Sequence, residues 1–131
     1  MATIHTDHVP RRRGRSHRQD CSGTAFATVE IVARACGLAP AALVSRSRLR
    51  YYAEARQIVF WLLREAGLSY PQIGAALDRH HTTVMHGVAE VEADSELRAL
   101  ARRILLREDV RQEANWRWGL PAPYPRDGGS R

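Results

Sequence analysis

Residues 78–86 have the sequence DRHHTTVMH, in which one arginine, three histidines and two threonines stand within nine positions. Val84, Val88 and Val91 then follow the three-to-four-residue spacing of the buried face of a helix. This spacing predicts a helix over about residues 81–94, with the polar side chains gathered at its beginning. A helix with this distribution is suited to present its first turn to a molecule outside the protein.

A shorter helix is predicted directly before this stretch. Ser69, Pro71 and Gln72 match a capping box, in which Ser69 is the N-cap, Pro71 lies in the first turn and the Gln72 side chain returns to the Ser69 amide. Apolar residues continue the helix until the polar residues 78–80 interrupt it. A short helix, a tight turn and a second helix form a helix-turn-helix motif.

Other segments also have helical periodicity, over about residues 24–36, 39–44, 52–66 and 95–105. We therefore predict an all-α fold, a small helical domain around a helix-turn-helix. Trp61 lies at the edge of an apolar stripe, where core packing is a more common role than stacking on a base. The predicted core positions of the two outer helices are Phe26, Val29, Val32, Ala33, Cys36, Leu97, Leu100, Ala101, Ile104 and Leu105.

Segments without this periodicity flank the helical region. Residues 1–22 are basic, polar and free of aromatic side chains, so we predict a disordered arm. Residues 114–131 are aromatic and rich in proline, and we predict an extended tail there. The resulting division is an arm (1–22), a helix-turn-helix domain (23–113) and a tail (114–131). The two tryptophans of the tail either fold back over the domain or form a short peptide for a partner protein.

The net charge of +6 is unevenly distributed. Residues 1–56 contain ten arginines and four acidic residues, whereas residues 57–131 contain ten of each. This asymmetry predicts a polyanionic partner, although a basic tail that only aids solubility is the simpler alternative. Arg46, Arg48 and Arg50 alternate along one segment, which by default is a solvated loop. Beside a DNA-binding helix, the same spacing suits a clamp on the phosphate backbone or the minor groove.

Several classes of function are disfavoured by composition. All 20 basic residues are arginine, so this sequence contains neither the lysine of a Walker A loop nor an amine for Schiff-base chemistry. His81 and His86 are five residues apart, about 140° around a helix, and no cysteine or carboxylate completes a metal site with them. We therefore expect no enzymatic activity, no metal, no cofactor and no bound nucleotide.

The expected cellular setting follows from the cysteines and the hydropathy. Cys21 and Cys36 do not form a disulfide framework, which favours reduced thiols. No apolar run approaches the roughly 18 residues of a membrane span, and the N-terminus lacks the apolar region of a secretory signal. We expect a cytoplasmic, nucleoid-associated protein with no membrane contact.

Several short motifs occur in a fixed order between about Thr28 and Arg107. They are Val32-Ala33, Leu43 with the arginine-rich loop, Ala55-Arg56-Gln57-Ile58, Leu62-Leu63-Arg64-Glu65, Ser69, Ile73-Gly74 and Arg79-His80-His81-Thr82-Thr83-Val84-Met85-His86. Together they resemble the C-terminal DNA-binding domain of the bacterial replication initiator DnaA, and the last motif is the most specific. The resemblance implies a Trp-repressor-like helix-turn-helix that binds short asymmetric initiator boxes in double-stranded DNA.

The resemblance also implies roles for individual residues. Arg48 corresponds to an arginine that the family inserts into the minor groove, where an A·T-rich site has enhanced negative potential. His81 and Thr82 correspond to major-groove contacts, and a threonine methyl can touch a thymine methyl. The candidate DNA-binding residues are Arg46, Arg48, Arg50, Arg56, Gln57, Arg64, Arg79, His80, His81, Thr82, Thr83 and His86.

Three positions depart from the family pattern. His80 stands where the family usually has an aspartate. An aspartate can accept a hydrogen bond from the amino group of cytosine, whereas a histidine can either donate or accept. The turn at residues 77–79 is one residue shorter than the usual double-glycine version, and Asp78 can enter the left-handed region less freely than glycine. Glu54 replaces a residue that is often basic, and we expect it to add repulsion near phosphate.

The chain is expected to be a stand-alone DNA-binding domain without the initiator's ATPase domain. The leading hypothesis is therefore a sequence-specific double-stranded DNA-binding protein that regulates replication initiation or transcription. The alternative is a protein-interaction module that acts on the replication initiator or its regulators rather than on DNA. His80, Glu54 and the tryptophan-bearing tail are the residues that favour this alternative.

Overall fold

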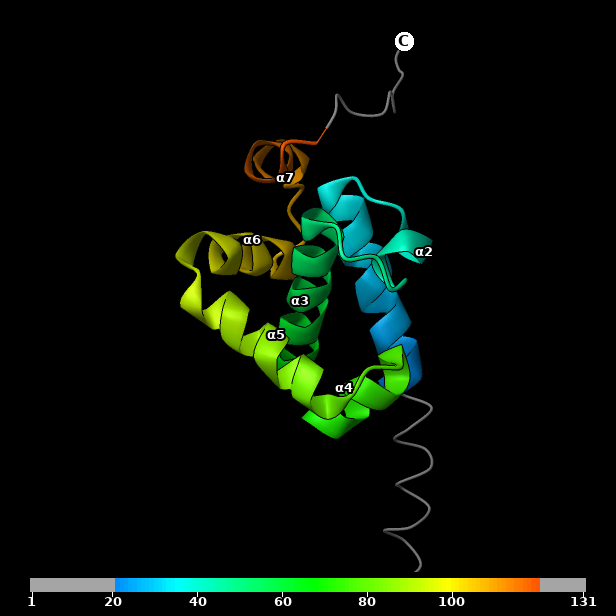
Figure 1. The fold of residues 1–131 in the computed structure, drawn as a ribbon. Coiled ribbons are helices and arrows are strands. Elements are labelled where there is room, and N and C mark those ends of the chain that lie inside the picture. Colours follow the sequence, from blue (N-terminus) through cyan, green and yellow to red (C-terminus); the bar gives the residue numbers. More distant parts are fainter. Residues whose placement is uncertain (1–20, 121–131) are drawn as a thin grey trace, which may run out of the picture.

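The computed structural model describes residues 21–120, and the regular elements of this part are all α-helices (Figure 1). The predicted all-α fold with a helix-turn-helix is therefore confirmed. The predictions for residues 1–20 and 121–131 lie outside the described residues. The helices are residues 21–36, α2 (Pro40–Leu43), α3 (Arg50–Glu65), α4 (Tyr70–Leu77), α5 (His81–Ala93), α6 (Ser95–Leu105) and α7 (Arg111–Trp118).

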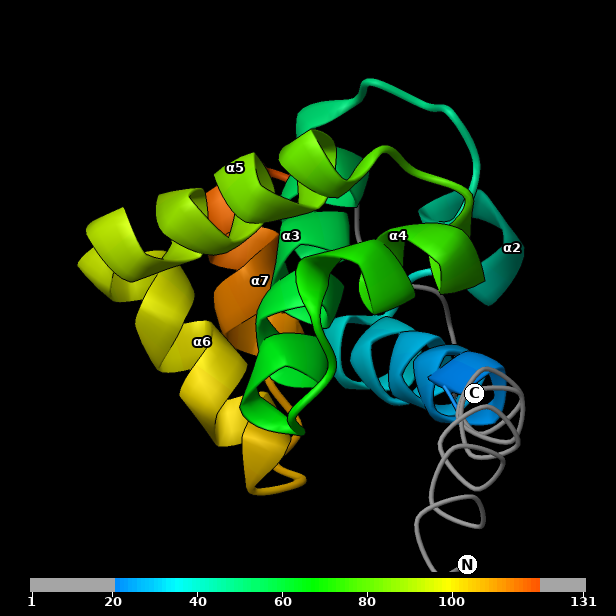
Figure 2. The ribbon, with the colours of Figure 1, turned by 90° about the horizontal axis from the view of Figure 1, so that it is seen from below.

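Helix α3 is the centre of the domain. The N-terminal helix lies on one side of it and α5 and α6 lie on the other, with α4 and α7 toward opposite ends (Figures 1 and 2). Ile58, Phe60 and Leu63 of α3 are among the largest fully buried side chains. Trp61 is also buried, as predicted, and its indole N–H donates to Glu92 Oε2 at 2.7 Å. The long predicted helix thus organises the core that holds the helix-turn-helix.

Two predicted core positions are wrong. The Phe26 side chain is 56% exposed and the Leu105 side chain is 43% exposed, whereas Ala25 is fully buried. Each exposed residue follows a buried neighbour by one position, which places it about a quarter of a turn from the stripe that packs inward. Helical spacing of apolar residues placed both in the core, but the packing direction of each helix excludes them.

The C-terminal segment differs from the predicted extended tail, because Arg111–Trp118 forms the helix α7. Val110, Ala114 and Trp118 recur at helical spacing and are buried, so the tryptophan ring folds back against the core. Gly119 ends the helix in the left-handed region, with φ of 64°. The prolines that suggested an extended chain begin only after this stop. Trp116, by contrast, remains 72% exposed.

Candidate nucleic-acid interface

The first helix of the helix-turn-helix begins with the predicted capping box. Ser69 Oγ accepts from the Gln72 amide at 3.2 Å, and Gln72 Oε1 accepts from the Ser69 amide at 2.8 Å. These reciprocal bonds satisfy two amides that a helix N-terminus otherwise leaves without partners. They fix the residue at which α4 begins, and therefore the position at which the chain leaves α4 and enters the turn.

The turn after α4 is held by a close approach of two backbone segments. The Arg79 amide donates to the Gly74 carbonyl at 2.8 Å, and Asp78 adopts the left-handed conformation, with φ of 56°. A Cβ at position 74 would lie 2.4 Å from the Arg79 carbonyl oxygen, so only glycine fits there without a shift of the backbone. The shortened turn is thus accommodated by Asp78 in an uncommon conformation and by the missing side chain of Gly74.

Helix α5 packs closely against the central helix α3. A Cβ at Gly87 would lie 2.6 Å from the Phe60 ring, so the glycine lets the α5 backbone approach α3. Val84, Val88 and Val91 are buried on the same side, as predicted. Because this inner side is fixed against the core, the orientation of the outer side of α5 is fixed as well.

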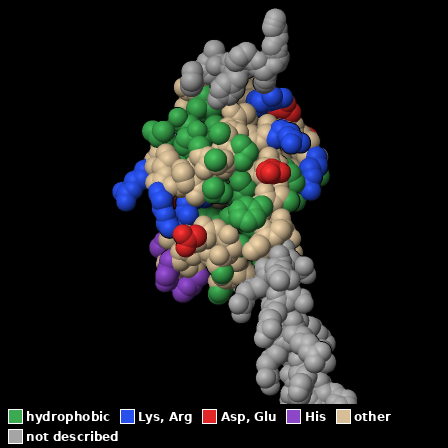
Figure 3. Space-filling view, turned by 90° about the vertical axis from the view of Figure 1, so that its right-hand side faces the viewer, with side chains coloured by type: hydrophobic (Ala, Val, Ile, Leu, Met, Phe, Trp, Pro, Cys, Tyr) green, Lys and Arg blue, Asp and Glu red, His purple; other side chains and the backbone are tan. Residues whose placement is uncertain are grey.

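The outer side of α5 presents the predicted polar residues to solvent. His81, Thr82, Thr83 and His86 are all exposed, and they come from the first two turns of the helix. In the space-filling view, histidines gather at one corner of the molecule, directly beside a group of arginine side chains (Figure 3). The helix therefore exposes donors and acceptors in the place that a recognition helix uses for base edges.

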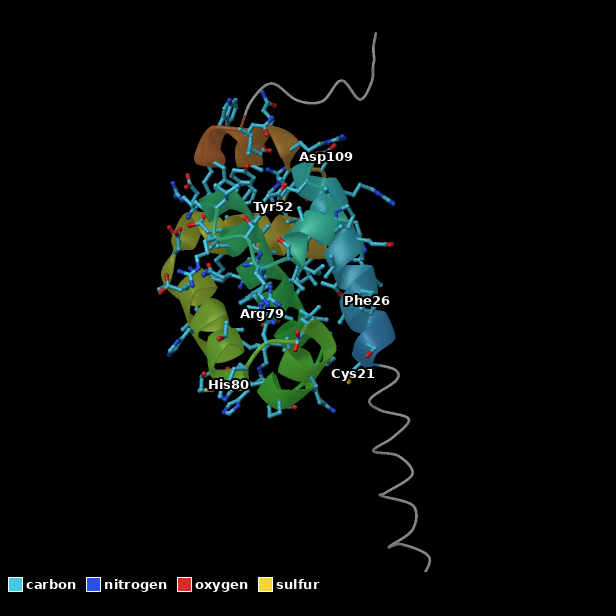
Figure 4. All side chains as sticks on the ribbon, turned by 45° about the vertical axis from the view of Figure 1, so that its right-hand side comes forward. Cys21, Phe26, Tyr52, Arg79, His80 and Asp109 are labelled. Carbon is cyan, nitrogen blue, oxygen red and sulfur yellow. The ribbon has the colours of Figure 1, made fainter. Side chains whose placement is uncertain are left out.

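His80 caps the N-terminus of α5 (Figure 4). Its Nδ1 accepts from the Thr82 amide at 3.2 Å and lies 2.8 Å from Thr82 Oγ1. The His81 ring stacks on the His80 ring, with centroids 4.5 Å apart. The imidazole thus supplies the cap acceptor at the position where the resemblance leads one to expect an aspartate.

Arg56 holds the loop between α2 and α3. Its guanidinium donates to the Leu43 carbonyl at 3.0 Å and to the Ser47 carbonyl at 3.2 Å. Burial lowers the pKa of Arg56, and the nearby charges of Arg79 and Arg46 lower it further. Carbonyl groups accept its hydrogen bonds without cancelling its charge, so this loop remains strongly positive.

Arg79 ties the helix-turn-helix to the same loop. Its guanidinium donates to the Ser45 carbonyl at 2.6 Å and to the Val44 carbonyl at 3.2 Å (Figure 4). Burial lowers the pKa of Arg79, and the charge of Arg46 acts in the same direction. The turn and the α2–α3 loop are therefore one structural unit, joined across more than thirty positions of sequence.

The other candidate arginines differ in their surroundings. Arg46 forms an exposed ion pair with Asp78 at 3.0 Å, and Arg50 pairs with Glu54 at 3.3 Å. Arg48 is exposed and makes no hydrogen bond or ion pair with any residue of the described region. Arg64 donates to the Leu68 carbonyl at 2.9 Å and lies over the Tyr70 ring, so it supports the connection between α3 and α4.

The structure thus gathers Arg46, Arg56 and Arg79 around the turn, next to the exposed start of α5. Gln57 is half-buried on α3 and lies close to Gly87 of α5. The sequence did not reveal that Arg56, Arg64 and Arg79 bind backbone carbonyls. No residue pattern carries that information, because every acceptor is a main-chain oxygen from another segment.

Glu54 was expected to repel phosphate, but its carboxylate is turned toward α7. Its Oε1 accepts from Arg117 Nε at 2.8 Å and from the Trp118 indole N–H at 2.7 Å. Burial raises the pKa of Glu54, but hydrogen bonds from Arg117, Trp118 and Arg50 outweigh burial and hold that pKa below its ordinary value. The charge of Glu54 is therefore balanced inside the protein.

Among residues 21–120, no three His, Cys, Asp or Glu side chains come together as a metal site requires. None of the helices in this region is both long and apolar enough to cross a membrane.

A second helix that exposes its polar first turn beside a cluster of arginines, two of which are held mainly by backbone carbonyls, is the arrangement of a helix-turn-helix DNA-binding domain. Residues 27–91 match the family described as the bacterial dnaA protein helix-turn-helix. Through this segment, the chain belongs to the DnaA helix-turn-helix family.

Several related proteins carry the description chromosomal replication initiator protein DnaA. The Thermomicrobium roseum protein is 48% identical over 79 residues, which is 54% of this chain and 17% of the relative. The Corynebacterium jeikeium protein is 34% identical over 91 residues, 68% of this chain and 16% of the relative. The matched part thus spans less than a fifth of each relative's length. No solved structure matches the chain.

Proposed function

We propose that this protein binds double-stranded DNA at specific short sites, with the first turn of α5 in the major groove. The observation that carries the proposal is the exposure of His81, Thr82 and Thr83 at the start of α5. The opposite side of this helix is packed against the core. Gly74 and Gly87 allow the turn and α5 to pack closely against their neighbours, so the polar groups at the start of α5 have a fixed orientation. A fixed orientation allows contacts with particular base edges to be selective.

The arginines around the turn are proposed to grip the DNA beside this helix. Arg48 is the candidate for insertion into the minor groove, because it is exposed on the α2–α3 loop and has no carboxylate partner in the described region. Arg46 forms an exposed ion pair with Asp78, and the Arg50 guanidinium is exposed although its partner Glu54 is mostly buried, so a phosphate can replace these weak contacts. Arg56 and Arg79 hold the α2–α3 loop through its carbonyl groups and add positive charge beside it.

Three further residues complete the proposed interface. Gln57 and His86 border the first turn of α5, and Arg64, in the last turn of α3, extends over the Tyr70 ring at the start of α4, where it would meet a phosphate of the DNA backbone. We place their contribution below that of Arg48 and Thr82. Arg64 already has an internal partner, and Gln57 is only half-exposed.

The proposed biological role is regulation of replication initiation or of transcription, by occupation of sites similar to the initiator boxes bound by DnaA. Such a protein would act in the cytoplasm on the nucleoid. The replication initiator or its regulators are further candidate partners. In this proposal the chain supplies the box-binding function alone, without enzymatic activity or a bound nucleotide.

Titration against a fluorescent duplex with an initiator-type box tests this function, with a scrambled duplex as reference and several salt concentrations. We expect preference for the box, a fall in affinity of about tenfold in Arg48→Ala, and a comparable loss in Thr82→Ala. Arg102→Ala, which removes an exposed charge from α6, serves as the matched control and should bind normally. A steep salt dependence without preference would indicate backbone binding only. Absence of binding at moderate salt would contradict the proposal and favour the interaction module.

A further inference from the structure

We propose that His80 and Thr82 act as one hydrogen-bonding unit that determines which base edges this protein reads, with a purine N7 facing His80. The inference rests on the proposed DNA-binding function and adds the chemistry of the selected base. Its basis is the pair of contacts that join the His80 ring to residue 82 at the start of α5.

The cap bond fixes the tautomer of the neutral His80 ring. A backbone N–H can only donate, so the 3.2 Å contact from the Thr82 amide requires a lone pair on His80 Nδ1. A neutral imidazole with a free Nδ1 carries its proton on Nε2. The helix cap therefore selects one tautomer of His80, and this tautomer has its donor on the side of the ring away from Thr82.

The same ring nitrogen orients the Thr82 hydroxyl. Thr82 Oγ1 lies 2.8 Å from His80 Nδ1, and because Nδ1 has no proton, the hydroxyl is the donor of this bond. The hydroxyl proton is thus committed inside the protein, and only the oxygen lone pairs face outward. Thr82 consequently presents an acceptor and a methyl group to any ligand of α5.

The His80 ring is also restricted in its rotation. The His81 ring is stacked on it with an interplanar angle of 29°, and both residues are exposed. The cap bond and the stack together limit rotation of the imidazole, so Nε2–H has a defined direction. Nε2 makes no hydrogen bond with residues 21–120, which leaves the donor available to a ligand.

These two groups define complementary base edges in the major groove. A donor at His80 matches the N7 acceptor of a purine, with guanine O6 as an additional acceptor. An acceptor at Thr82 matches the amino group of adenine or cytosine. An aspartate at position 80 would retain the cap acceptor but present no outward donor, and so could not select the same purine edge.

Two variants separate capping from base selection. His80→Asp keeps an acceptor for the Thr82 amide, because aspartate is a strong N-cap residue, but it removes the outward N–H. His80→Asn is the matched control, because its amide supplies an acceptor for the cap and also an N–H donor. Thermal unfolding followed by circular dichroism should show both variants folded.

The DNA experiment begins with selection of bound duplexes from a random pool by the full chain. Each purine of the selected site is then replaced singly by its 7-deaza analogue, which lacks only the N7 acceptor. We expect one position in the major groove where the analogue weakens wild-type binding by between about twofold and tenfold, as befits one neutral hydrogen bond. The same analogue should leave His80→Asp unaffected and still weaken His80→Asn.

The outcomes distinguish the two proposals. If the selection enriches no sequence, specific DNA binding fails and the inference fails with it. If a site is enriched but the wild type and His80→Asp respond identically to every 7-deaza substitution, only the inference is overturned, and a phosphate contact by Nε2 is the explanation. Histidine ¹⁵N shifts of the free protein provide an independent test, in which a His80 ring protonated mainly on Nδ1 would also overturn it.

Discussion

Arginines at two places in this small domain are held in chemically different ways. At α7, the Arg117 guanidinium is bound by three carboxylates, with Glu54 at 2.8 Å, Asp94 at 2.7 Å and Glu96 in direct contact. Around the turn, Arg56 and Arg79 are bound mainly by backbone carbonyls. A carboxylate neutralises the positive charge of the guanidinium group that it binds. A backbone carbonyl orients the guanidinium group but leaves its positive charge available to a partner.

The difference would allow one chain to use arginine both to join helices in its interior and, in the proposed interface, to attract a polyanion. The Arg117 side chain is only 6% exposed, and it joins α3, the start of α6 and α7 at one point. The hydrogen bond to Glu54 raises the pKa of Arg117 above its ordinary value despite burial, and Asp94 adds to this effect. Burial is the main cause of the lowered pKa values of Arg56 and Arg79 at the turn, and repulsion between neighbouring arginines lowers them further.

The largest effect is expected from Arg117→Ala. It leaves the Glu54 carboxylate without its main partner and detaches α7, so the free energy of unfolding should fall by about 3 kcal/mol. Urea denaturation followed by circular dichroism measures this, with the exposed Arg102→Ala as the control. The DNA affinity of the folded fraction should be unchanged. A variant as stable as the wild type would show that the ion pairs of Arg117 do not stabilise the fold.

A smaller effect on stability, but a larger one on binding, is expected from Gly74→Ala. The new methyl group would meet the Arg79 carbonyl, so the turn must shift at a cost of about 1–3 kcal/mol. Because this shift moves the start of α5, box affinity should fall even where the variant is fully folded. Fluorescence anisotropy at a temperature below the unfolding transition tests this, and unchanged affinity would mean that the turn does not position the helix.

The pH dependence of stability should also distinguish the two regions. Glu54 and Asp94 have lowered pKa values in the folded protein, so their contribution is present above the ordinary carboxyl pKa of about 4 and is lost as pH falls through the folded values. For Asp94, the main cause is the hydrogen bond from the Leu97 amide, followed by that from Arg117. Glu54→Gln should reduce the loss of stability in this acid range. An identical acid profile for the variant and the wild type would contradict the role of Glu54.

The smallest effect is expected from Arg56→Lys, which keeps the charge but cannot reproduce the two directed bonds to the Leu43 and Ser47 carbonyls. The free energy of unfolding should fall by about 1 kcal/mol, and box affinity should decrease by less than in Arg48→Ala. Urea denaturation and anisotropy on the same samples compare the two effects. A variant that binds as weakly as Arg48→Ala would instead make Arg56 a direct DNA contact.

Much of the fold was predictable because it rests on local chemistry. The Ser69 capping box, the helical spacing of the valines in α5 and the left-handed Asp78 are all encoded within a few residues of one another. The exposed polar start of α5 was predictable for the same reason. The particular DNA contacts of the candidate residues remain predictions.

The remaining features depend on contacts distant in sequence. The close packing at Gly87 depends on Phe60, and the role of Glu54 depends on Arg117, sixty-three positions away. The α7 helix was misjudged because prolines after residue 120 dominated the composition, whereas the burial of Trp118 decided the conformation. Such pairings have no signature in a single sequence.

Chemical-shift mapping by NMR during titration with a box duplex tests most directly whether DNA binds at the loop and turn held by Arg56 and Arg79, and not at the region around Arg117. We expect large changes in the amides of residues 44–48 and 78–86, and none in residues 111–118. Arginine side-chain signals should broaden or shift for Arg48 and remain constant for Arg117. Perturbation centred on α6 and α7, with the start of α5 unaffected, would contradict the proposed interface.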